Sequence, residues 1–290
     1  MILITGSTGL LGSTLVPWLK THGKTIVTHA RQTNADYTAD LVSKSETFTL
    51  LNKIQPSVIV NLVGLTSVER CQDHANESYL VNSQTVENIT NWILQSGSNC
   101  HLIQISTDQV YDGIGIHTED QVTITNNYAF SKYAGELAAA RVSSTILRTN
   151  FVGRSKIEHR ESLTDWVYNS LTNRKHVQVL QDVFFSPLSM KTLVEMIQLV
   201  IEKKPVGIFN LGSKNGMSKA DFDFNFAEQL NLPTETMTRI NSSQASFLKA
   251  YRPKDMRMDS SKFERTMNIQ LPALINQIKN IAKEYYVEAK

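Results

Sequence analysis

The stretch that decides the fold is MILITGSTGLLG, residues 1–12. A short apolar run ends at Gly6, and Gly9 and Gly12 continue a G-x-x-G-x-x-G spacing. Residues 10–23 then show helical periodicity and end at a glycine. A glycine turn between a first strand and a first helix brings backbone N–H groups and a helix N-terminus to a pyrophosphate. The stretch therefore predicts a dinucleotide-binding turn, and a turn that binds nothing is the alternative.

Strand and helix patterns alternate through the first half of the chain. Short runs rich in β-branched residues are separated by longer stretches with helical periodicity. This alternation is typical of a parallel sheet with helices on both faces. We therefore expect an α/β protein with a doubly wound parallel sheet, a Rossmann fold. The expected strands are residues 25–30, 57–61, 101–106 and 144–149, and the expected helices are residues 46–54, 75–95 and 128–141.

The pattern loosens after residue 150, which predicts a second, smaller lobe. A tail from about residue 218 to 290 is expected to be mostly helical. We expect a dinucleotide-binding domain over residues 1–150, with residues 186–212 returning to it. A small, mostly helical substrate-binding lobe is expected from residues 151–185 and 213–290. The remaining expected elements are helices at 163–171 and 189–201 and strands at 176–180 and 207–212.

The composition excludes several classes of partner. The chain has 290 residues with a formal net charge of +2, and it lacks a run of basic residues. It is therefore not expected to bind a nucleic acid polymer or an anionic membrane surface. No stretch reaches the roughly 18 apolar residues of a membrane span. The first residues lack the basic segment of a secretion signal, so a cytoplasmic location is expected.

Cysteine and histidine usage points to a reduced protein without a metal. Cys71 and Cys100 form no C-x-x-C pair, so we expect free thiols in a reducing compartment. The seven histidines lack the spacing of common metal-binding motifs. No metal site is expected.

Arg31 follows the second predicted strand, about 20 residues after the glycines. NAD-binding proteins carry an acidic residue there that bonds the ribose 2′-hydroxyl. A guanidinium pairs instead with a 2′-phosphate, so the sequence favours NADPH, with NADH as the alternative. The competing interpretation of Arg31 is a solvated arginine at a strand end.

Tyr128 and Lys132 lie four residues apart in NNYAFSKYAGE, residues 126–136. On a helix they would share a face. A nearby ammonium favours the phenolate and lowers the pKa of a tyrosine, which suits proton transfer alongside hydride transfer. A Y-x-x-x-K spacing also arises by chance, so the pair gains meaning only beside a cofactor.

In this order, the glycines, Thr107 and the Tyr128–Lys132 pair resemble the extended short-chain dehydrogenase/reductases. Further segments are similar to the dTDP-4-dehydrorhamnose reductase branch of that superfamily. They span nearly the whole chain, so the resemblance is more specific than any one motif. These segments are VNLVGLTSVERCQDHANESYLVN (60–82), STDQVYDG (106–113), residues 126–136, ILRTNFVG (146–153), GIFNLGS (207–213) and RPKDMRMDSSK (252–262).

The resemblance implies roles for individual residues. Thr107 would hydrogen-bond the substrate carbonyl, Tyr128 would donate the proton, and Lys132 would hold the nicotinamide ribose and tune Tyr128. Residues implied at the cofactor are Gly6, Thr8, Gly9, Leu10, Leu11, Gly12, Arg31, Asp40, Leu41, Asn61, Leu62, Val63, Gly64 and Lys132. Residues implied at the substrate are Thr66, Asp108, Gln109, Tyr128, Asn150, Phe151 and Arg252.

Gln109 separates this chain from related dehydratases. Nucleotide-sugar 4,6-dehydratases read Thr-Asp-Glu where this chain reads Thr107-Asp108-Gln109. An amide is no general acid or base near neutral pH, so simple carbonyl reduction is favoured. Asp108 would then orient the loop or a sugar hydroxyl, and a turn-stabilising aspartate is the equal alternative.

The chain also departs from the family pattern. Ala129 replaces the glycine after the tyrosine, Ile124 stands near a usual proline, and Phe151 replaces a frequent tryptophan. The sugar or the base of the substrate is therefore open to difference. Stacking or phosphate pairing by Phe151, Trp166 and Arg252 is one interpretation, and core packing is the other.

The sequence thus predicts an NADPH-dependent reductase of the 4-keto group of a nucleotide-linked 4-keto-6-deoxy sugar, in the simplest case dTDP-4-dehydro-rhamnose. The expected partner is the nucleotide-sugar substrate, with a homodimer as a further expectation. Two alternatives stay open. One is an NADP-binding regulatory subunit resembling the methionine adenosyltransferase β subunit, and the other is a nucleotide-sugar epimerase, which would consume no net NADPH.

Overall fold

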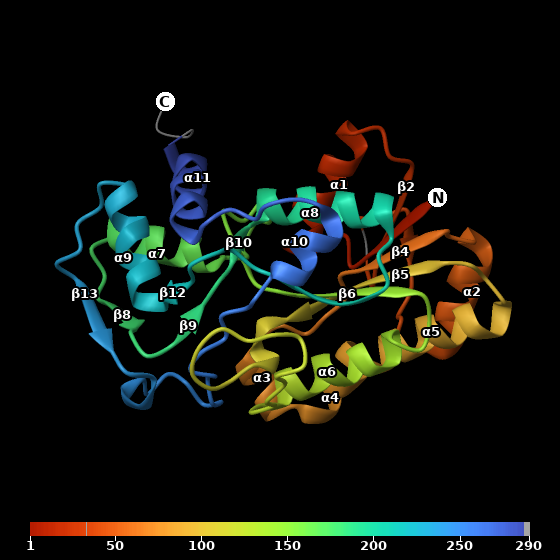
Figure 1. The fold of residues 1–290 in the computed structure, drawn as a ribbon, viewed down its shortest axis with the longest axis horizontal. Coiled ribbons are helices and arrows are strands. Elements are labelled where there is room, and N and C mark those ends of the chain that lie inside the picture. Colours follow the sequence, from red (N-terminus) through yellow and green to blue (C-terminus); the bar gives the residue numbers. More distant parts are fainter. Residues whose placement is uncertain (33, 287–290) are drawn as a thin grey trace.

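A parallel sheet of seven strands organises the larger lobe. The computed structural model describes residues 1–32 and 34–286. All neighbouring strands of this sheet run parallel (Figure 1). In spatial order the strands are β11 (Gly207–Leu211), β6 (Ser144–Thr149), β5 (His101–Thr107), β4 (Val58–Asn61), β1 (Ile2–Thr5), β2 (Ile26–Ala30) and β3 (Tyr37–Thr38).

Helices cover both faces of this sheet, as the alternating pattern predicted. On one face, α1 (Gly12–Thr21), α8 (Met190–Lys203) and α10 (Ser261–Met267) share an apolar cluster with the strands. On the other face, α2 (Lys44–Ile54), α5 (Thr85–Ser96) and α6 (Asn127–Ala139) share a second cluster (Figure 1). The doubly wound Rossmann-like fold is therefore confirmed.

The strand order reverses between β1 and β4, and this reversal positions the functional cleft. The chain runs from β1 to β2 and β3 at one edge, then returns to β4 on the other side of β1. Ligands of open α/β sheets bind at such a switch point, outside the carboxyl ends of the strands. Here β1, β4, β5 and β6 all end in polar residues, namely Thr5, Asn61, Thr107 and Thr149.

The helix expected at residues 75–95 contains a π-helical turn. It consists of α4 (Ala75–Tyr79), the π turn η1 (Leu80–Gln84) and α5, with the short helix α3 (Val68–Asp73) before it. A Cβ atom at Gly135 would lie 2.5 Å from the Asn82 carbonyl oxygen. The glycine therefore lets α6 approach this turn closely, and single π turns are frequent at functional sites.

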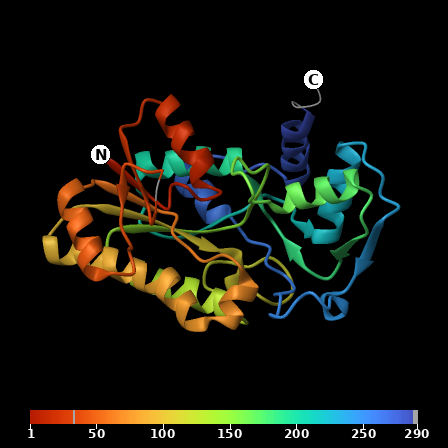
Figure 2. The same cartoon turned by 180° about the vertical axis from the view of Figure 1, so that it is seen from behind.

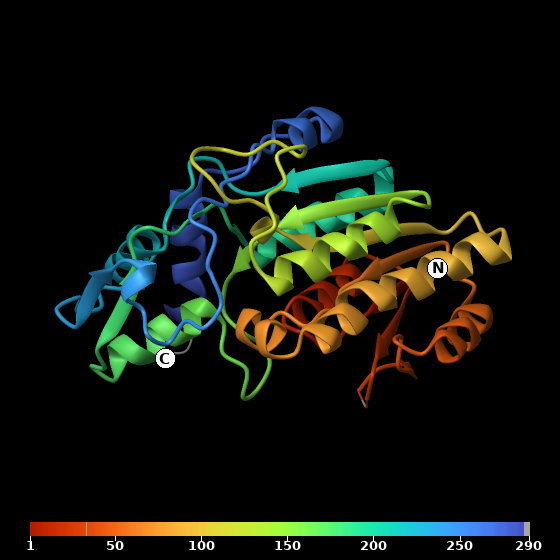
Figure 3. The same cartoon turned by 90° about the horizontal axis from the view of Figure 1, so that it is seen from below.

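A second lobe is built around its own apolar cluster. Its main elements are α7 (Leu163–Thr172), α9 (Lys219–Gln229), α11 (Leu274–Tyr286) and the parallel pair β8 (Val177–Leu180) and β13 (Met237–Ile240). Figure 2 shows this lobe beside the sheet lobe, and Figure 3 shows the chain segments that cross between them. Two further small sheets have two strands each. One pairs β7 (Phe151–Val152) with β10 (Leu188–Ser189), and the other pairs β9 (Phe184–Phe185) with β12 (Met217–Ser218). The pairing of β2 with β3 at the edge of the large sheet is equally short.

The tail after residue 218 differs from the expectation in two respects. Its described residues, up to 286, hold three helices, but residues 237–260 form β13, the 3-10 turn η3 (Ser242–Gln244) and extended segments. In addition, α10 packs on the sheet, where the rings of Phe263 and Phe209 lie 6.1 Å apart. The expected boundary at 213–290 had placed this helix in the second lobe. No helix of the described residues is long and apolar enough to cross a membrane.

Candidate active site

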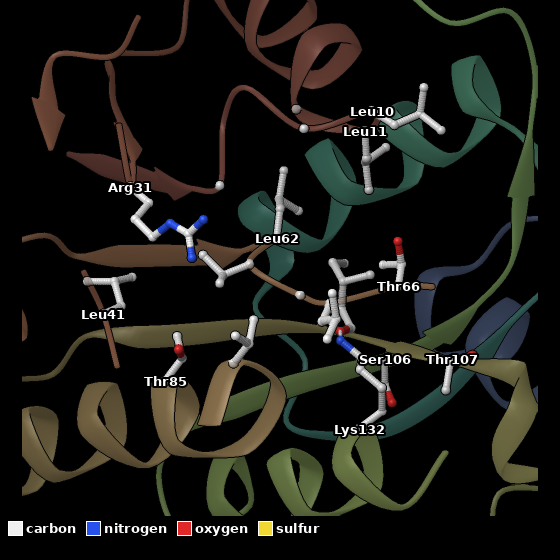
Figure 4. Close-up of a pocket in the computed structure, with 18 of the residues that line it drawn as sticks. Leu10, Leu11, Arg31, Leu41, Leu62, Thr66, Thr85, Ser106, Thr107 and Lys132 are labelled. Carbon is white, nitrogen blue, oxygen red and sulfur yellow. Dashed lines mark hydrogen bonds between the residues drawn. The ribbon is translucent and has the colours of Figure 1, made fainter. Parts of the chain in front are cut away.

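One cleft of about 580 Å³ opens at the switch point of the sheet. Figure 4 places Arg31 and Leu41 toward one end and Thr107 and Lys132 toward the other. Twenty of the sequence-predicted residues line it. They are Gly6, Thr8, Gly9, Leu10, Leu11, Gly12, Arg31, Asp40, Leu41, Leu62, Val63, Gly64, Thr66, Thr107, Asp108, Gln109, Tyr128, Lys132, Asn150 and Phe151.

The glycine turn lies at the middle of this cleft. Gly6 has a φ of +68°, and a Cβ on Gly12 would lie 2.3 Å from the Ser7 carbonyl oxygen, so both positions require glycine. No side chain caps α1. The amides of Leu10, Leu11 and Gly12 donate no hydrogen bond within residues 1–32 and 34–286. These free donors at a helix N-terminus fit the pyrophosphate of a dinucleotide.

Arg31 is exposed at the end of β2 and extends over the cleft (Figure 4). No carboxylate of the described chain pairs with its guanidinium. Asp40 lies nearby, but its Oδ1 accepts the Val42 amide at 3.0 Å and is thereby held in its own turn. The cation at this end therefore stays available to an anionic group.

The loop after β4 is held from below by two asparagines. Asn61 is fully buried and does not line the cleft, although it was expected at the cofactor. Its Oδ1 accepts from Thr5 Oγ1 at 2.6 Å and from the Val63 amide at 3.3 Å. Asn82, in the π turn, accepts the Leu65 amide at 2.8 Å and donates to the Leu65 carbonyl at 3.0 Å. Sequence reasoning missed Asn82 because a π turn has no evident sequence signal.

Thr107, Tyr128 and Lys132 meet where β5 ends and α6 begins. The N-cap Asn126 starts α6 by accepting the Ala129 amide at 2.8 Å. Tyr128 and Lys132 are both buried, one turn apart on the face toward β5. The Lys132 ammonium donates to the Ile105 carbonyl oxygen at 2.7 Å. The fold thus brings the three side chains together from positions that span 25 residues of the sequence.

Burial controls the protonation of this group. It raises the pKa of the Tyr128 phenol, and a hydrogen bond with the Thr107 side chain partly offsets the rise. It lowers the pKa of the Lys132 ammonium to about 8, although the Glu136 carboxylate acts in the opposite direction. The lowering of the Tyr128 pKa that was expected from Lys132 is therefore not seen, because desolvation is the dominant influence on the phenol. The phenol is protonated at neutral pH, as a proton donor must be.

Asp108 lines the cleft beside Thr107. Its carboxylate is buried, and it accepts from Asn150 Nδ2 at 2.7 Å and from Thr107 Oγ1 at 3.3 Å. Burial raises the pKa of Asp108 to about 6, and the Asn150 hydrogen bond opposes this rise. Gln109 accepts from Asn126 Nδ2 at 3.3 Å. The expected hydroxyl, carboxylate and amide therefore line one end of the cleft together.

A buried ion pair supports α6 from beneath. The Arg148 guanidinium donates to the Glu136 carboxylate at 2.7 Å, and both side chains are 1% exposed. Arg148 also donates to the Tyr111 hydroxyl at 2.7 Å and to the Glu119 carbonyl at 2.6 Å. The sequence alone did not single out this pair. Glu136 lies one helical turn after Lys132, and that spacing is the signal that was available.

Two aromatic or basic residues considered for the substrate lie outside the cleft. Arg252 pairs with Glu69 at 2.5 Å and donates to the Ala250 carbonyl at 3.1 Å. Its expected place at the substrate is therefore not seen, because a neighbouring carboxylate already holds the guanidinium. Trp166 is on α7 and is 38% exposed. Of Phe151, Trp166 and Arg252, only Phe151 lines the cleft.

Other lining residues had drawn no attention. Arg70 and Glu77 form an exposed pair with an N–O distance of 2.6 Å, and Arg160 reaches the cleft from the loop before α7. Thr85 and Ser106 also line it. Arg70 and Glu77 lie on the short helices α3 and α4, and isolated charged residues on short helices or in loops carry little sequence signal before the fold places them. No group of three or more potential metal ligands occurs among the described residues.

Comparison with known proteins assigns the family. The family described as RmlD substrate binding domain matches residues 1–287. The chain belongs to the RmlD family. The dTDP-4-dehydrorhamnose reductase of Shigella flexneri is 26% identical over 301 residues, with 98% of each chain covered. The membership therefore agrees with the resemblance that the sequence carries.

Solved structures of RmlD-family proteins share the fold. That of a Clostridium acetobutylicum dTDP-4-dehydrorhamnose reductase has a TM-score of 0.88 at 22% identity, with 99% of each chain covered. That of the Bacillus anthracis enzyme in complex with NADP has a TM-score of 0.87 at 21% identity, with 98% of each chain covered. The whole length of this RmlD-family chain, both lobes included, follows that fold.

Proposed function

We propose that this protein is an NADPH-dependent oxidoreductase that reduces the 4-keto group of a nucleotide-linked 4-keto-6-deoxy sugar, in the simplest case dTDP-4-dehydro-rhamnose to dTDP-rhamnose. The observation that carries the proposal is the convergence of Thr107, Tyr128 and Lys132 at one end of a cleft that holds the glycine turn. The names of the RmlD-family relatives support the substrate, and the NADP complex of one of them supports the cofactor.

The cofactor would lie along the cleft from Arg31 to Lys132. The free amides of Leu10, Leu11 and Gly12 would bind its pyrophosphate. The unpaired Arg31 would bind a 2′-phosphate, and Asp40 and Leu41 would flank the adenine. These residues would hold a reduced nicotinamide cofactor, whose chemistry when bound would be hydride donation. Leu62, Val63 and Gly64 would border the cofactor, with Asn61 holding their loop rather than touching it.

The proton would come from Tyr128. Its phenol is protonated at neutral pH, since the ordinary pKa of a tyrosine is about 10 and burial raises it further. Thr107 would hydrogen-bond the substrate carbonyl and align it with the phenol, so that Tyr128 protonates the forming alkoxide. Lys132, whose ammonium already donates to the Ile105 carbonyl, would hold the ribose and stabilise the phenolate that Tyr128 leaves after it gives up its proton. Asp108, Gln109, Asn150, Thr66 and Phe151 would surround the sugar.

The assignment of the two lobes belongs to the same proposal. The sheet lobe would bind the dinucleotide, and the second lobe would bind the nucleotide sugar. We also propose a cytoplasmic location, which both free, buried thiols suit. A homodimer remains a prediction that light scattering of the purified protein would test.

The test is NADPH oxidation by Tyr128→Phe with enzymatically prepared dTDP-4-keto-6-deoxy sugar. We expect roughly 10²- to 10⁴-fold slower turnover, the usual contribution of a general acid, with unchanged NADPH affinity. Tyr133→Phe is the matched control, because Tyr133 is on the same helix but does not line the cleft. Near-wild-type reduction by Tyr128→Phe would remove this residue from the mechanism.

The wild-type result separates the alternatives. Rapid oxidation of NADPH supports the reductase. Product formation without net oxidation supports an epimerase. Binding of NADPH without oxidation, across a panel of keto sugars, supports the regulatory subunit.

A further inference from the structure

Residues 249–252 cross from the second lobe to the sheet lobe, and we call this segment the strap. The chain leaves the core of the second lobe after Leu248 and returns to it at Met256, since both side chains pack in its apolar cluster. Between these two residues, the strap contacts α3 and the start of α6, the helix that carries Tyr128. None of the four strap residues lines the cleft.

Glu69 of α3 binds the strap with both carboxylate oxygens. Its Oε2 accepts from the Lys249 amide at 3.0 Å and from the Ala250 amide at 2.9 Å. Its Oε1 accepts from the Arg252 guanidinium at 2.5 Å. Burial alone would raise the pKa of Glu69, but the Ala250 amide and the Arg252 charge outweigh burial and hold this pKa below its usual range. The carboxylate is therefore ionised at neutral pH, and hydrogen bonds to an ionised acceptor are stronger than neutral ones.

A second set of contacts connects the strap to the beginning of α6. Asn126, the N-cap of α6, donates to the Tyr251 carbonyl oxygen at 3.2 Å. The Tyr251 hydroxyl in turn donates to Asp112 Oδ2 at 2.9 Å. Because Tyr128 follows the cap by two residues, the strap is bonded to the residue that starts the helical turn of Tyr128.

Ala250 of the strap lies in a small apolar cluster with Tyr128. The other buried members of this cluster are Val68 and Cys71 of α3, and all four residues are at most 9% exposed. Since the cluster draws on α3, α6 and the strap, it is complete only while the strap lies against α3. The strap thus takes part in the burial of Tyr128, from a position outside the lining of the cleft.

We propose that Glu69 is a positioning residue for the proton donor: it holds the strap against α3, so that Ala250 fixes the Tyr128 ring and keeps water from its outer side. This inference rests on the proposed function, because it takes Tyr128 as the proton donor. The rate of proton transfer depends on how the phenol is placed, and a displacement of about 1 Å costs up to about 10²-fold. Docking of the second lobe through Glu69 is then a condition for proton donation.

The first test compares the kcat of Glu69→Gln with that of the wild type, using NADPH and the dTDP-4-keto-6-deoxy sugar. The glutamine keeps the length of the side chain, but it removes the charge and brings an N–H donor to the donors of the strap. We expect kcat to fall roughly 10- to 100-fold through misplacement of Tyr128. The affinity for NADPH should stay unchanged, because Glu69 does not line the cleft.

A second readout follows the ionisation of Tyr128 without any substrate. Burial raises the pKa of its phenol, so loosening of the strap in Glu69→Gln should lower this pKa toward the ordinary value of about 10. Asp108 and Cys71 act in the same direction as burial, and Lys132 lies one turn away on α6; the substitution leaves all three in place. The ultraviolet absorbance of each protein, minus that of the same protein with Tyr128→Phe, isolates the phenolate.

Two further variants separate positioning from general loosening. Asp73→Asn removes another ion pair between α3 and the strap, but Lys249 and Asp73 are 68% and 47% exposed at an N–O distance of 3.1 Å. Exposed pairs contribute little, so neither readout should change. Ala250→Gly keeps the amide that Glu69 binds and removes only the methyl group from the cluster. It should move both readouts in the same direction as Glu69→Gln, by a smaller amount, even if Glu69→Gln folds poorly.

Two results would overturn the proposal. A lower melting temperature of Glu69→Gln with an unchanged kcat and an unchanged Tyr128 titration would make Glu69 a structural residue only. Equal effects of Glu69→Gln and Asp73→Asn would show that loss of any charge on α3 is sufficient. If the wild type itself oxidises no NADPH with any keto sugar, the proposed function fails separately. The titration of Tyr128 then still tests the strap, because it requires no turnover.

Discussion

Replacement of Glu136 by Gln should destabilise the protein more than loss of a surface ion pair with a similar N–O distance. The glutamine keeps most of the shape but removes the negative charge, which leaves the Arg148 guanidinium charged and buried at 1% exposure. Breaking a buried pair in this way costs about 3–5 kcal/mol. That is a large part of the 5–15 kcal/mol by which a folded protein is typically stable. We expect a clear fall in melting temperature.

The matched control is Glu202→Gln. Its partner is Lys24, at an N–O distance of 2.6 Å compared with 2.7 Å in the buried pair, but the side chains are 28% and 42% exposed. Exposed pairs contribute about 0–1 kcal/mol because water screens them. Urea unfolding followed by circular dichroism measures both variants under one condition. An equal effect of the two substitutions would refute the argument that burial, rather than distance, sets the cost.

A second measurement links this pair to the active site. The Glu136 carboxylate raises the pKa of Lys132, so Glu136→Gln should lower that pKa below its value of about 8. The Lys132 ammonium would then lose its proton at a lower pH, and the alkaline limb of the kcat profile should move in the same direction. The double variant Glu136→Leu with Arg148→Met should recover stability, because it leaves no unpaired charge. It should not restore the wild-type pH profile.

Three further changes test other parts of the site. Arg31→Gln should reduce the preference for NADPH over NADH roughly 10- to 100-fold by loss of a charge-assisted hydrogen bond, and an unchanged ratio of kcat/KM values would show that Arg31 is only a surface residue. Gly12→Ala puts a Cβ 2.3 Å from the Ser7 carbonyl oxygen and should abolish cofactor binding. Gly23→Ala strains the backbone at a φ of +71° but meets no atom within 4 Å, so it should preserve cofactor binding; equal affinities of the two variants in a fluorescence titration would contradict this. Burial raises the pKa of Asp108 to about 6, above the value of an aspartate in the unfolded chain. Ionisation of Asp108 therefore destabilises the folded protein. This destabilisation is complete above pH 6 and absent below about pH 4. Asp108→Asn should therefore raise the free energy of unfolding by up to about 3 kcal/mol at pH 8, with a gain that disappears toward pH 4, and a gain independent of pH would contradict this cause.

Much of the fold could be predicted because its signals are local. The glycine turn after β1 is one contiguous motif. The alternation of β-branched runs with helical periodicity continues through residue 150, and each strand or helix signal covers only a few residues. The structure confirms a doubly wound sheet from these signals. The region from residue 237 to 260 has neither period, so its extended path depends on contacts with both lobes. The packing of α10 on the sheet likewise depends on Phe209, 54 residues away from Phe263.

The site residues could be predicted where they belong to contiguous motifs. They were harder to predict where a charged side chain pairs with a residue that is distant in the sequence. The glycine turn, residues 107–109, Tyr128 and Lys132 all line the cleft. Arg252 was assigned to the substrate, but Glu69 holds its guanidinium, and no sequence spacing relates these two residues.

The interleaving of the two lobes along the chain sets an order for their assembly during synthesis. Strands β1 to β6 lie within the first 149 residues, so most of the sheet can form while the ribosome is still translating the rest. The core of the second lobe combines Val152, residues of α7 and α9, and residues of α11 as late as Tyr285. That core cannot close until α11 has emerged. The nascent protein should therefore gain a place for its dinucleotide well before it gains a place for its sugar.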